Sequence, residues 1–302
     1  MPELWIPITI AAAFFQNLRS ALQKHLKGRL STVGAGYSRF LYALPVAAVY
    51  LWIVTYSTGQ PLPEIHNKFL LYCVIGGFCQ IMFTVFLLWM FSFQSFAVGT
   101  TFSKLEVIMV AILGTVILRD VLNIAAIVAI CISALGVIAL SLGQNKISLD
   151  SLFTGLFRKP TFIGLVCAAW LGGSVVFFRG ASLSLEQESF VLAAAYTLFV
   201  SLLVQNLMMG GYLLIQEPGE IGRVLKNWRW AGAAGITGAL ASICWFTAFT
   251  IQNASYVRAL GQIELVFTFF ATTVFFREKI SPAELVGIVL VCAGILILLL
   301  LG

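Results

Sequence analysis

Apolar runs long enough to cross a membrane recur along almost the whole chain. A transmembrane helix needs about 20 mostly apolar residues. Windows that meet this requirement lie at about residues 4–23, 33–56, 68–92, 96–118, 121–143, 160–181, 188–215, 229–252, 255–276 and 281–301. Only 10% of the 302 residues are charged, which excludes an ordinary water-soluble domain. Because the runs are continuous and do not alternate with polar residues, they predict an all-α membrane protein with ten transmembrane helices.

Several classes of function lack the motifs that they require. The chain contains two histidines, no Cys-x-x-Cys pair and no glycine-rich phosphate loop ending in Gly-Lys-Ser/Thr. We therefore expect no metal, no cofactor and no ATPase, and a membrane-embedded enzyme is disfavoured. The net charge of +6 is interpreted as a signal of membrane orientation and not of nucleic-acid binding.

The chain divides into two similar halves of five spans each. We expect a first repeat at residues 1–143, a connecting loop at 144–159 and a second repeat at 160–302. An offset of 158 residues pairs Glu106 with Glu264, and it also pairs Arg119 with Arg277 and Gly136 with Gly294. Because five is odd, the two copies must enter the bilayer from opposite sides. The pattern predicts an inverted repeat, which allows one site to face either side of a membrane.

The basic residues are distributed unevenly between the two sets of connections. Connections 1–2, 5–6, 7–8 and 9–10 hold 12 lysines and arginines, whereas connections 2–3, 4–5, 6–7 and 8–9 hold 3. The positive-inside rule places the richer side in the cytoplasm. We therefore expect a multi-pass protein of the cell inner membrane with both termini on the non-cytoplasmic side.

The sequence resembles the EamA-domain family of the drug/metabolite transporter superfamily over essentially its whole length. Each half ends with a helix, a short turn of arginine and acid, and a glycine-bearing final helix. The turns are Arg119-Asp120 and Arg277-Glu278-Lys279, and the final helices carry Gly136 and Gly294. The resemblance implies a ten-helix transporter of small metabolites. It also implies a central cavity between the halves, lined chiefly by spans 1, 3, 4, 6, 8 and 9.

Two carboxylates, Glu106 and Glu264, lie near the middle of spans four and nine. A bare carboxylate at that depth costs about 2.5 to 3.5 kcal/mol, so each should face the interior, be paired, or be protonated. One hypothesis is a site for protons or cationic substrates, and the other is a structural pair that joins helices. Lys104 and Arg39 are candidate partners in charge coupling, although Arg39 could equally be an interfacial anchor. For Arg258, near the start of span nine, an extended position toward the interface is the simpler interpretation.

Amides and tryptophans form a second polar set within the spans. We predict substrate contacts for Gln16, Asn17, Gln80, Trp89, Trp170, Trp245 and Gln262. Unpaired amides in lipid cost several kcal/mol, so they should point inward. Hydrogen bonding between helices is the expected role of Gln205 and Asn206. Plain packing remains the alternative for the three tryptophans.

Together these patterns predict a secondary active transporter that works by alternating access. We expect an exporter of small polar metabolites such as amino acids, with Glu106 and Glu264 as candidates for proton coupling. The alternatives are a transporter of lipid-like or cationic substrates, in which the carboxylates are counter-ions, and a non-transport membrane protein. The expected partners are a small-molecule substrate and the lipid bilayer, and both monomer and dimer remain open.

Overall fold

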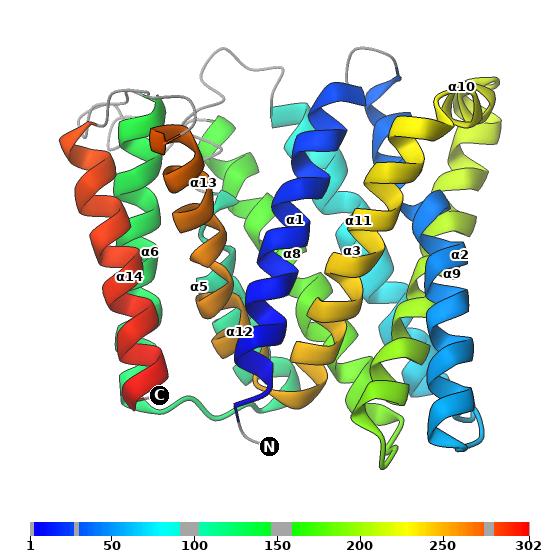
Figure 1. The fold of residues 1–302 in the computed structure, drawn as a ribbon, viewed down its shortest axis with the longest axis horizontal. Coiled ribbons are helices and arrows are strands. Elements are labelled where there is room, and N and C mark those ends of the chain that lie inside the picture. The colour runs from blue at the N-terminus through cyan, green and yellow to red at the C-terminus, as the bar shows by residue number, and fades with distance from the viewer. Residues whose placement is uncertain (1–2, 27–29, 91–102, 146–158, 275–280, 302) are drawn as a thin grey trace. The chain divides into compact units, whose positions relative to one another are not determined.

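The computed structural model describes residues 3–26, 30–90, 103–145, 159–274 and 281–301, and within these ranges the regular elements are helices (Figure 1). Seven helical segments in the described ranges are long and apolar enough to cross a membrane. The elements are α1 (Trp5–Leu26), α2 (Thr32–Thr58), α3 (Asn67–Met90), α5 (Glu106–Leu113), η1 (Gly114–Leu118), α6 (Ile124–Asn145), α8 (Lys159–Ser184), α9 (Phe190–Gln216), α10 (Glu220–Lys226), α11 (Trp228–Ile251), α12 (Ala254–Gly261), α13 (Ile263–Val274) and α14 (Pro282–Leu301).

The described helices coincide with the expected apolar windows, with differences in detail. Residues 96–102 of window 96–118 lie outside the described residues, and the window ends in α5 and the π-helix η1. Window 255–276 contains two helices, α12 and α13, separated at Gln262. A short helix, α10, occupies part of what the sequence predicts to be a connection after span seven. The Arg277-Glu278-Lys279 turn and most of the connecting loop at 144–159 lie outside the described residues.

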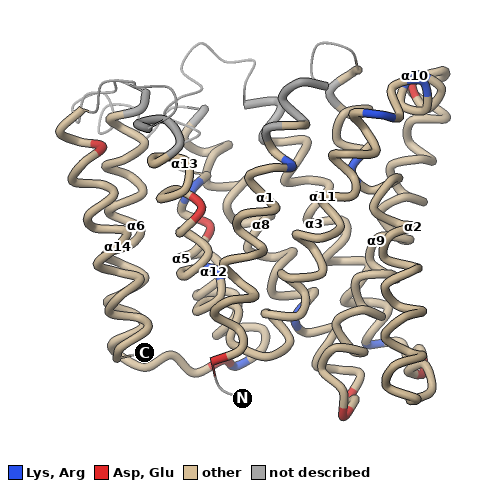
Figure 2. The backbone as a smooth tube through the Cα atoms, in the orientation of Figure 1, with Lys and Arg blue, Asp and Glu red and all other residues tan. Residues whose placement is uncertain are grey.

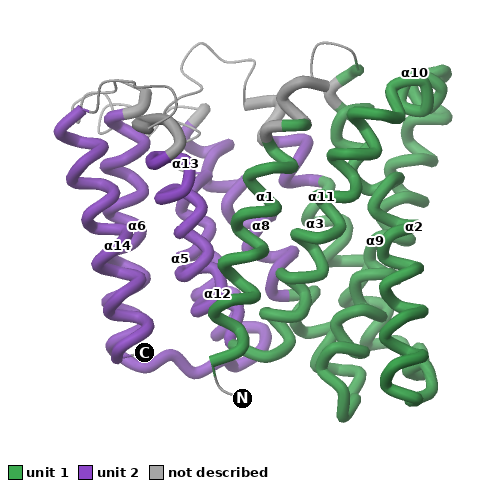
Figure 3. Tube along the Cα trace, viewed as in Figure 1, with its two compact units in different colours: residues 1–81, 177–252 green, residues 82–176, 253–302 purple. Residues whose placement is uncertain are grey.

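The chain separates into two compact units (Figure 3). Unit 1 comprises residues 1–81 and 177–252, and unit 2 comprises residues 82–176 and 253–302. Each unit therefore draws on both halves of the sequence, and the continuous helices α3 and α8 contribute residues to both. The division of the sequence into repeats at 1–143 and 160–302 is thus a different division from that into compact units.

Unit 1 is organised around helices α2, α9 and α11. α2 runs antiparallel to α9, because Asn206 Nδ2 donates to Phe40 O at 2.9 Å while Gly210 lies against the earlier residue Tyr37. α1 packs against α11, which also contacts α2. Aromatic and aliphatic side chains from these helices, with Phe178 of α8, fill the core. The buried surface of unit 1 is therefore built mainly by contacts between different apolar helices.

The start of α2 is held by a group of hydrogen bonds from the α9–α10 corner. Ser31 caps α2, because its hydroxyl accepts from the Gly34 backbone N–H at 3.0 Å and donates to Glu217 at 2.6 Å. The Ser31 backbone N–H donates to the buried Glu220 carboxylate at 2.6 Å, and Glu220 also pairs with Arg223. These bonds satisfy N–H groups that a helix start leaves without partners.

In unit 2, helices α6 and α14 pack with their backbones in close contact. The two helices are antiparallel, since Asn123 Nδ2 donates to Leu301 O at 3.3 Å at one end while Gly143 lies against Glu284 at the other. A methyl group added to Gly136 would stand 2.7 Å from the Val291 backbone nitrogen. Glycine is therefore required for this approach, as is common between membrane helices.

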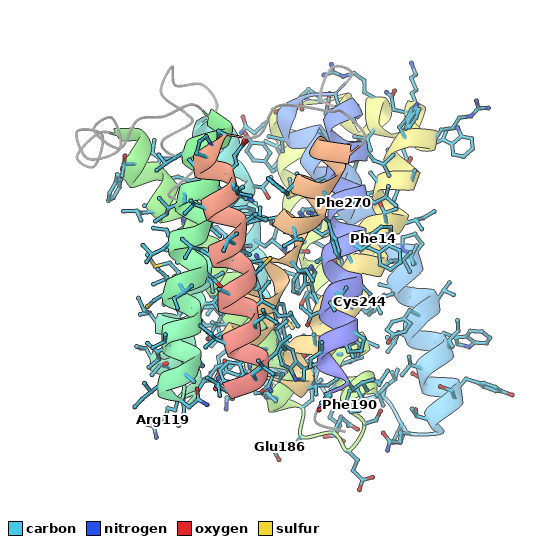
Figure 4. All side chains as sticks on the ribbon, turned by 60° about the vertical axis from the view of Figure 1, so that its left-hand side comes forward. Phe14, Arg119, Glu186, Phe190, Cys244 and Phe270 are labelled. Carbon is cyan, nitrogen blue, oxygen red and sulfur yellow. The ribbon has the colours of Figure 1, made fainter. Side chains whose placement is uncertain are left out.

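The outer surfaces of the helices are largely apolar. Phe14 and Phe270 are more than half exposed, and Glu186 lies in the connection between α8 and α9, at the helix ends (Figure 4). α14 begins at Pro282, and the preceding Ser281 exchanges hydrogen bonds of 2.7 and 3.3 Å with Glu284. Ser281 and Glu284 therefore form a capping box, and Pro282 occupies the first position of α14.

Candidate functional site

Both mid-span carboxylates belong to unit 2, and each follows an interruption in a helix. α5 begins at Glu106, directly after a turn that includes Lys104. α13 begins one residue before Glu264, and the interruption that precedes it is Gln262. Lys104 and Gln262 are 158 residues apart, which is the offset that relates the two halves. The two helix breaks therefore occupy matching positions in the repeats.

A helix start is a favourable place for a carboxylate. The first N–H groups of a helix have no partners within it, and the helix dipole gives this end a partial positive charge. Glu106 lies in the first turn of α5 and Glu264 in the first turn of α13. The breaks thus supply positive ends of helices where two negative side chains enter an apolar segment.

Glu106 forms an ion pair with Arg258 of α12. Both side chains are nearly enclosed, with 9% of the Glu106 side chain and 8% of the Arg258 side chain exposed. The position expected for Arg258 near the interface is therefore wrong. The arginine lies inside because the buried Glu106 carboxylate needs a positive charge beside it in a low-dielectric environment.

Glu264 forms a second and more open ion pair with Lys104, at 3.8 Å. The Lys104 side chain is 40% exposed and the Glu264 side chain 15%. Arg258 is also close enough to attract Glu264 electrostatically. Charges of both signs therefore gather where α5 and α13 begin, together with Arg258 of α12 (Figure 2). We name Lys104, Glu106, Arg258 and Glu264 the charge cluster.

Three predicted substrate contacts also fall in unit 2. Gln262 is buried at the break between α12 and α13, where its backbone N–H donates to Ala259 O at 3.2 Å. Trp170 is half-buried on α8. Trp89 lies on α3, and its side chain is outside the described part of the structure. Of these three, Gln262 is adjacent in sequence to the charge cluster.

The other predicted substrate contacts fall in unit 1. The Trp245 indole N–H of α11 donates to Gln16 Oε1 of α1 at 3.0 Å, and Asn17 is half-buried beside Gln16 in the chain. Gln205 Nε2 of α9 donates to Gln80 Oε1 of α3 at 2.6 Å. The expectation that Gln205 and Asn206 join helices through hydrogen bonds is confirmed, since both bond to other helices.

Unit 1 contains a small pocket with polar groups on its wall. Arg39 of α2 and Gln80 of α3 line it, together with Ser201, Gln205 and Ser242. Arg39 also stacks over the Phe40 ring, 4.6 Å from the ring centroid. Arg39 and Gln80 stand out in the sequence as polar residues within spans, whereas Ser201 and Ser242 do not. A serine within a span carries too weak a signal to separate a pocket wall from ordinary packing.

One of the comparisons with known proteins identifies a family. The model of the EamA-like transporter family matches the chain twice, at residues 3–142 and 159–300. A solved structure described only as "Crystal structure of protein" superposes with a TM-score of 0.71 at 12% sequence identity, covering 98% of this chain and 96% of that one. The curated proteins offer no match.

The two comparisons support different conclusions. The structural similarity, at such low identity, concerns the fold alone. The family model covers most of the chain in two successive copies, and the multi-pass helical architecture agrees with a membrane transporter. This chain belongs to the EamA-like transporter family.

Proposed function

We propose that the protein is a proton-coupled secondary transporter that exports small polar metabolites such as amino acids. The observation that carries the proposal is the pair of matching helix breaks, each followed by a carboxylate that is ion-paired within unit 2. Discontinuous helices at corresponding positions of two repeats are the feature on which transporters commonly build coupling and substrate sites.

The proposal includes ten spans arranged as two inverted repeats. Support comes from equivalent helices that pack against each other in opposite directions, namely α2 with α9 and α6 with α14. Gly136 and its counterpart Gly294 both lie at the α6–α14 contact. Two copies of a five-helix repeat that cross a bilayer in opposite directions would produce this antiparallel packing of equivalent helices.

Within the charge cluster, we assign the proton to Glu264. Its ion pair with Lys104 is long and partly exposed, whereas Glu106 is enclosed with Arg258. A proton on Glu264 neutralises the carboxylate and removes its attraction for Lys104. Protonation is thereby linked to separation of α13 from the turn that carries Lys104, which is the kind of local change that alternating access requires.

A cationic substrate with the carboxylates as counter-ions is less well supported. Each carboxylate of the cluster already has a cation of the protein beside it. A substrate ammonium group would have to displace a lysine or a buried arginine. The ion pairs therefore favour the proton as the competitor, because it is small enough to reach a paired carboxylate.

The test is flux in proteoliposomes across an imposed pH gradient. We expect Glu264→Gln to abolish the pH dependence of amino-acid flux, while Glu188→Gln, the same change in the exposed α8–α9 connection, leaves it intact. Unchanged pH dependence in Glu264→Gln would exclude this carboxylate from coupling. The absence of flux for any tested metabolite in the folded wild-type protein would reject the proposed transport of small polar metabolites.

The proposed orientation has both termini on the non-cytoplasmic side of the cell inner membrane. It rests on the 12-to-3 distribution of basic residues between the two sets of connections. A C-terminal fusion to an enzyme that is active only outside the cytoplasm should be active. Activity of a fused reporter that folds only in the cytoplasm would reverse the orientation.

A further inference from the structure

The pocket of unit 1 combines a cation with neutral hydrogen-bonding groups. Arg39 comes from α2, Gln80 from α3 and Gln205 from α9, while Ser242 of α11 completes the polar wall. These residues lie within long helices and not at their ends, so the pocket is at membrane depth. The pocket is small in this conformation, with room for about one water-sized group.

The charge of Arg39 lies among neutral polar and apolar groups in the wall of this pocket. Among the described residues of unit 1, none of the carboxylates lies within ion-pair distance of its guanidinium group, which stacks over the Phe40 ring. Arginine remains protonated in proteins, so it cannot avoid the free-energy cost of a buried charge by losing its proton. A half-buried guanidinium group among apolar helices therefore favours an anion as its neighbour.

A second arginine strengthens this preference. The Arg19 side chain of α1 packs against Gly238 of α11, where a methyl group would stand 3.1 Å from Arg19 Cδ. Gly238 is itself part of the pocket wall, and Arg19 is close enough to Arg39 to repel it electrostatically. Two neighbouring positive charges raise the local potential, and a bound negative group would lower their mutual repulsion.

We propose that the Arg39 pocket binds the carboxylate group of the transported metabolite. The planar guanidinium group offers two parallel N–H donors that match the two oxygens of a carboxylate. The Gln80–Gln205 amide pair and the Ser242 hydroxyl provide neutral hydrogen-bonding groups beside it. The inference rests on the proposed transport function and narrows its substrates to those that carry a carboxylate, free or as part of a zwitterion.

The experiment is a thermal-shift titration of purified full-length protein with matched sets of compounds. One set is L-leucine, isovalerate and isoamylamine, and the other is L-phenylalanine, 3-phenylpropionate and phenethylamine. Within each set the hydrocarbon part is kept while the carboxylate or the amine is removed. A ligand that binds the folded state raises its apparent stability. Inorganic phosphate is added as a separate arm to test for a general anion site.

For wild-type protein we expect stabilisation by members that carry a carboxylate and none by the amines or phosphate. Arg39→Gln should weaken carboxylate binding by roughly 10- to 100-fold, the loss expected for hydrogen bonds to a charged group. Arg39→Lys should retain part of the binding, because it keeps the charge but loses the two-donor geometry. Arg229→Gln, the same change at the exposed start of α11, serves as the control and should bind normally.

Three outcomes would overturn the carboxylate site. They are stabilisation by the amines alone, unchanged carboxylate binding in Arg39→Gln, and no response of wild-type protein to any carboxylate. Stabilisation by phosphate alone would replace it with an inorganic-anion site. Flux of an amine in proteoliposomes would leave the transporter function standing while rejecting this pocket, so the two proposals can fail separately. If Arg39→Gln fails to fold, the Arg39→Lys titration decides.

Discussion

Units 1 and 2 place charged groups inside apolar helices in two different ways. In unit 2, Glu106 meets Arg258 and Glu264 meets Lys104, so each charge is compensated by another from the protein. In unit 1, Arg39 lies beside neutral amides and hydroxyls. A compensated pair is suited to a local switch, since it can open when one member is neutralised. An uncompensated cation is suited to a ligand that brings the missing charge.

The largest expected effect comes from breaking the enclosed pair of unit 2. Glu106→Gln leaves the buried Arg258 guanidinium group without its counter-charge, and we expect a loss of about 3 to 5 kcal/mol of unfolding free energy. Replacing both members, with Glu106→Gln and Arg258→Gln together, should recover most of that loss. Thermal unfolding of the three purified proteins measures this. A double variant as unstable as Glu106→Gln would argue against the compensation account.

A smaller effect is expected from the backbone contact in unit 2. In Gly136→Ala, the added methyl group would meet the Val291 backbone nitrogen at 2.7 Å, so α6 and α14 must separate. We expect destabilisation of about 1 to 3 kcal/mol. Gly211→Ala on α9 of unit 1 is the matched control, because nothing lies within 4 Å of its added methyl group. Equal unfolding temperatures for the two variants would show that the α6–α14 contact tolerates separation.

The smallest effect, and the sharpest contrast with Glu106→Gln, is expected for Arg39. Arg39→Met removes a cation that has no counter-charge among the described residues of unit 1, and its apolar chain preserves much of the packing against Phe40. We expect the ligand-free protein to change by less than about 1 kcal/mol, in the stabilising direction. Thermal unfolding without added substrate measures it. A loss as large as that of Glu106→Gln would mean that Arg39 has a structural partner, and the contrast between the units would disappear.

The helices could be predicted from the sequence because long apolar runs leave a membrane chain little alternative. The matching breaks before Glu106 and Glu264 could not, since a single turn hardly alters the hydropathy of a window. The short helix α10 could not be predicted either. Its seven residues are too few to form a membrane-spanning run, and they follow Pro218 and Gly219, which are typical of a turn. Local sequence signals record burial in lipid better than interruptions of a helix.

The candidate site was predictable in its residue types but not in its pairings. Glu106, Glu264 and Lys104 stand out because charges are rare within the spans. The sequence places Arg258 near the interface only if window 255–276 forms one unbroken helix, in which this residue lies close to the start. The break at Gln262 and the packing of α12 on α5 place it beside Glu106 instead. Which cation meets which carboxylate depends on contacts between distant segments, which periodicity does not encode.

The glycine contact between α6 and α14 has a mechanical consequence. Two helices whose backbones approach closely at several glycines resist sliding past one another, since close packing leaves little free space for displacement. We expect α6 and α14 to move together as one rigid body. Bending during the transport cycle would then concentrate at the interrupted turns before Glu106 and Glu264, where fewer backbone hydrogen bonds oppose it. The flexible points of the described part of unit 2 would thus lie at the charge cluster.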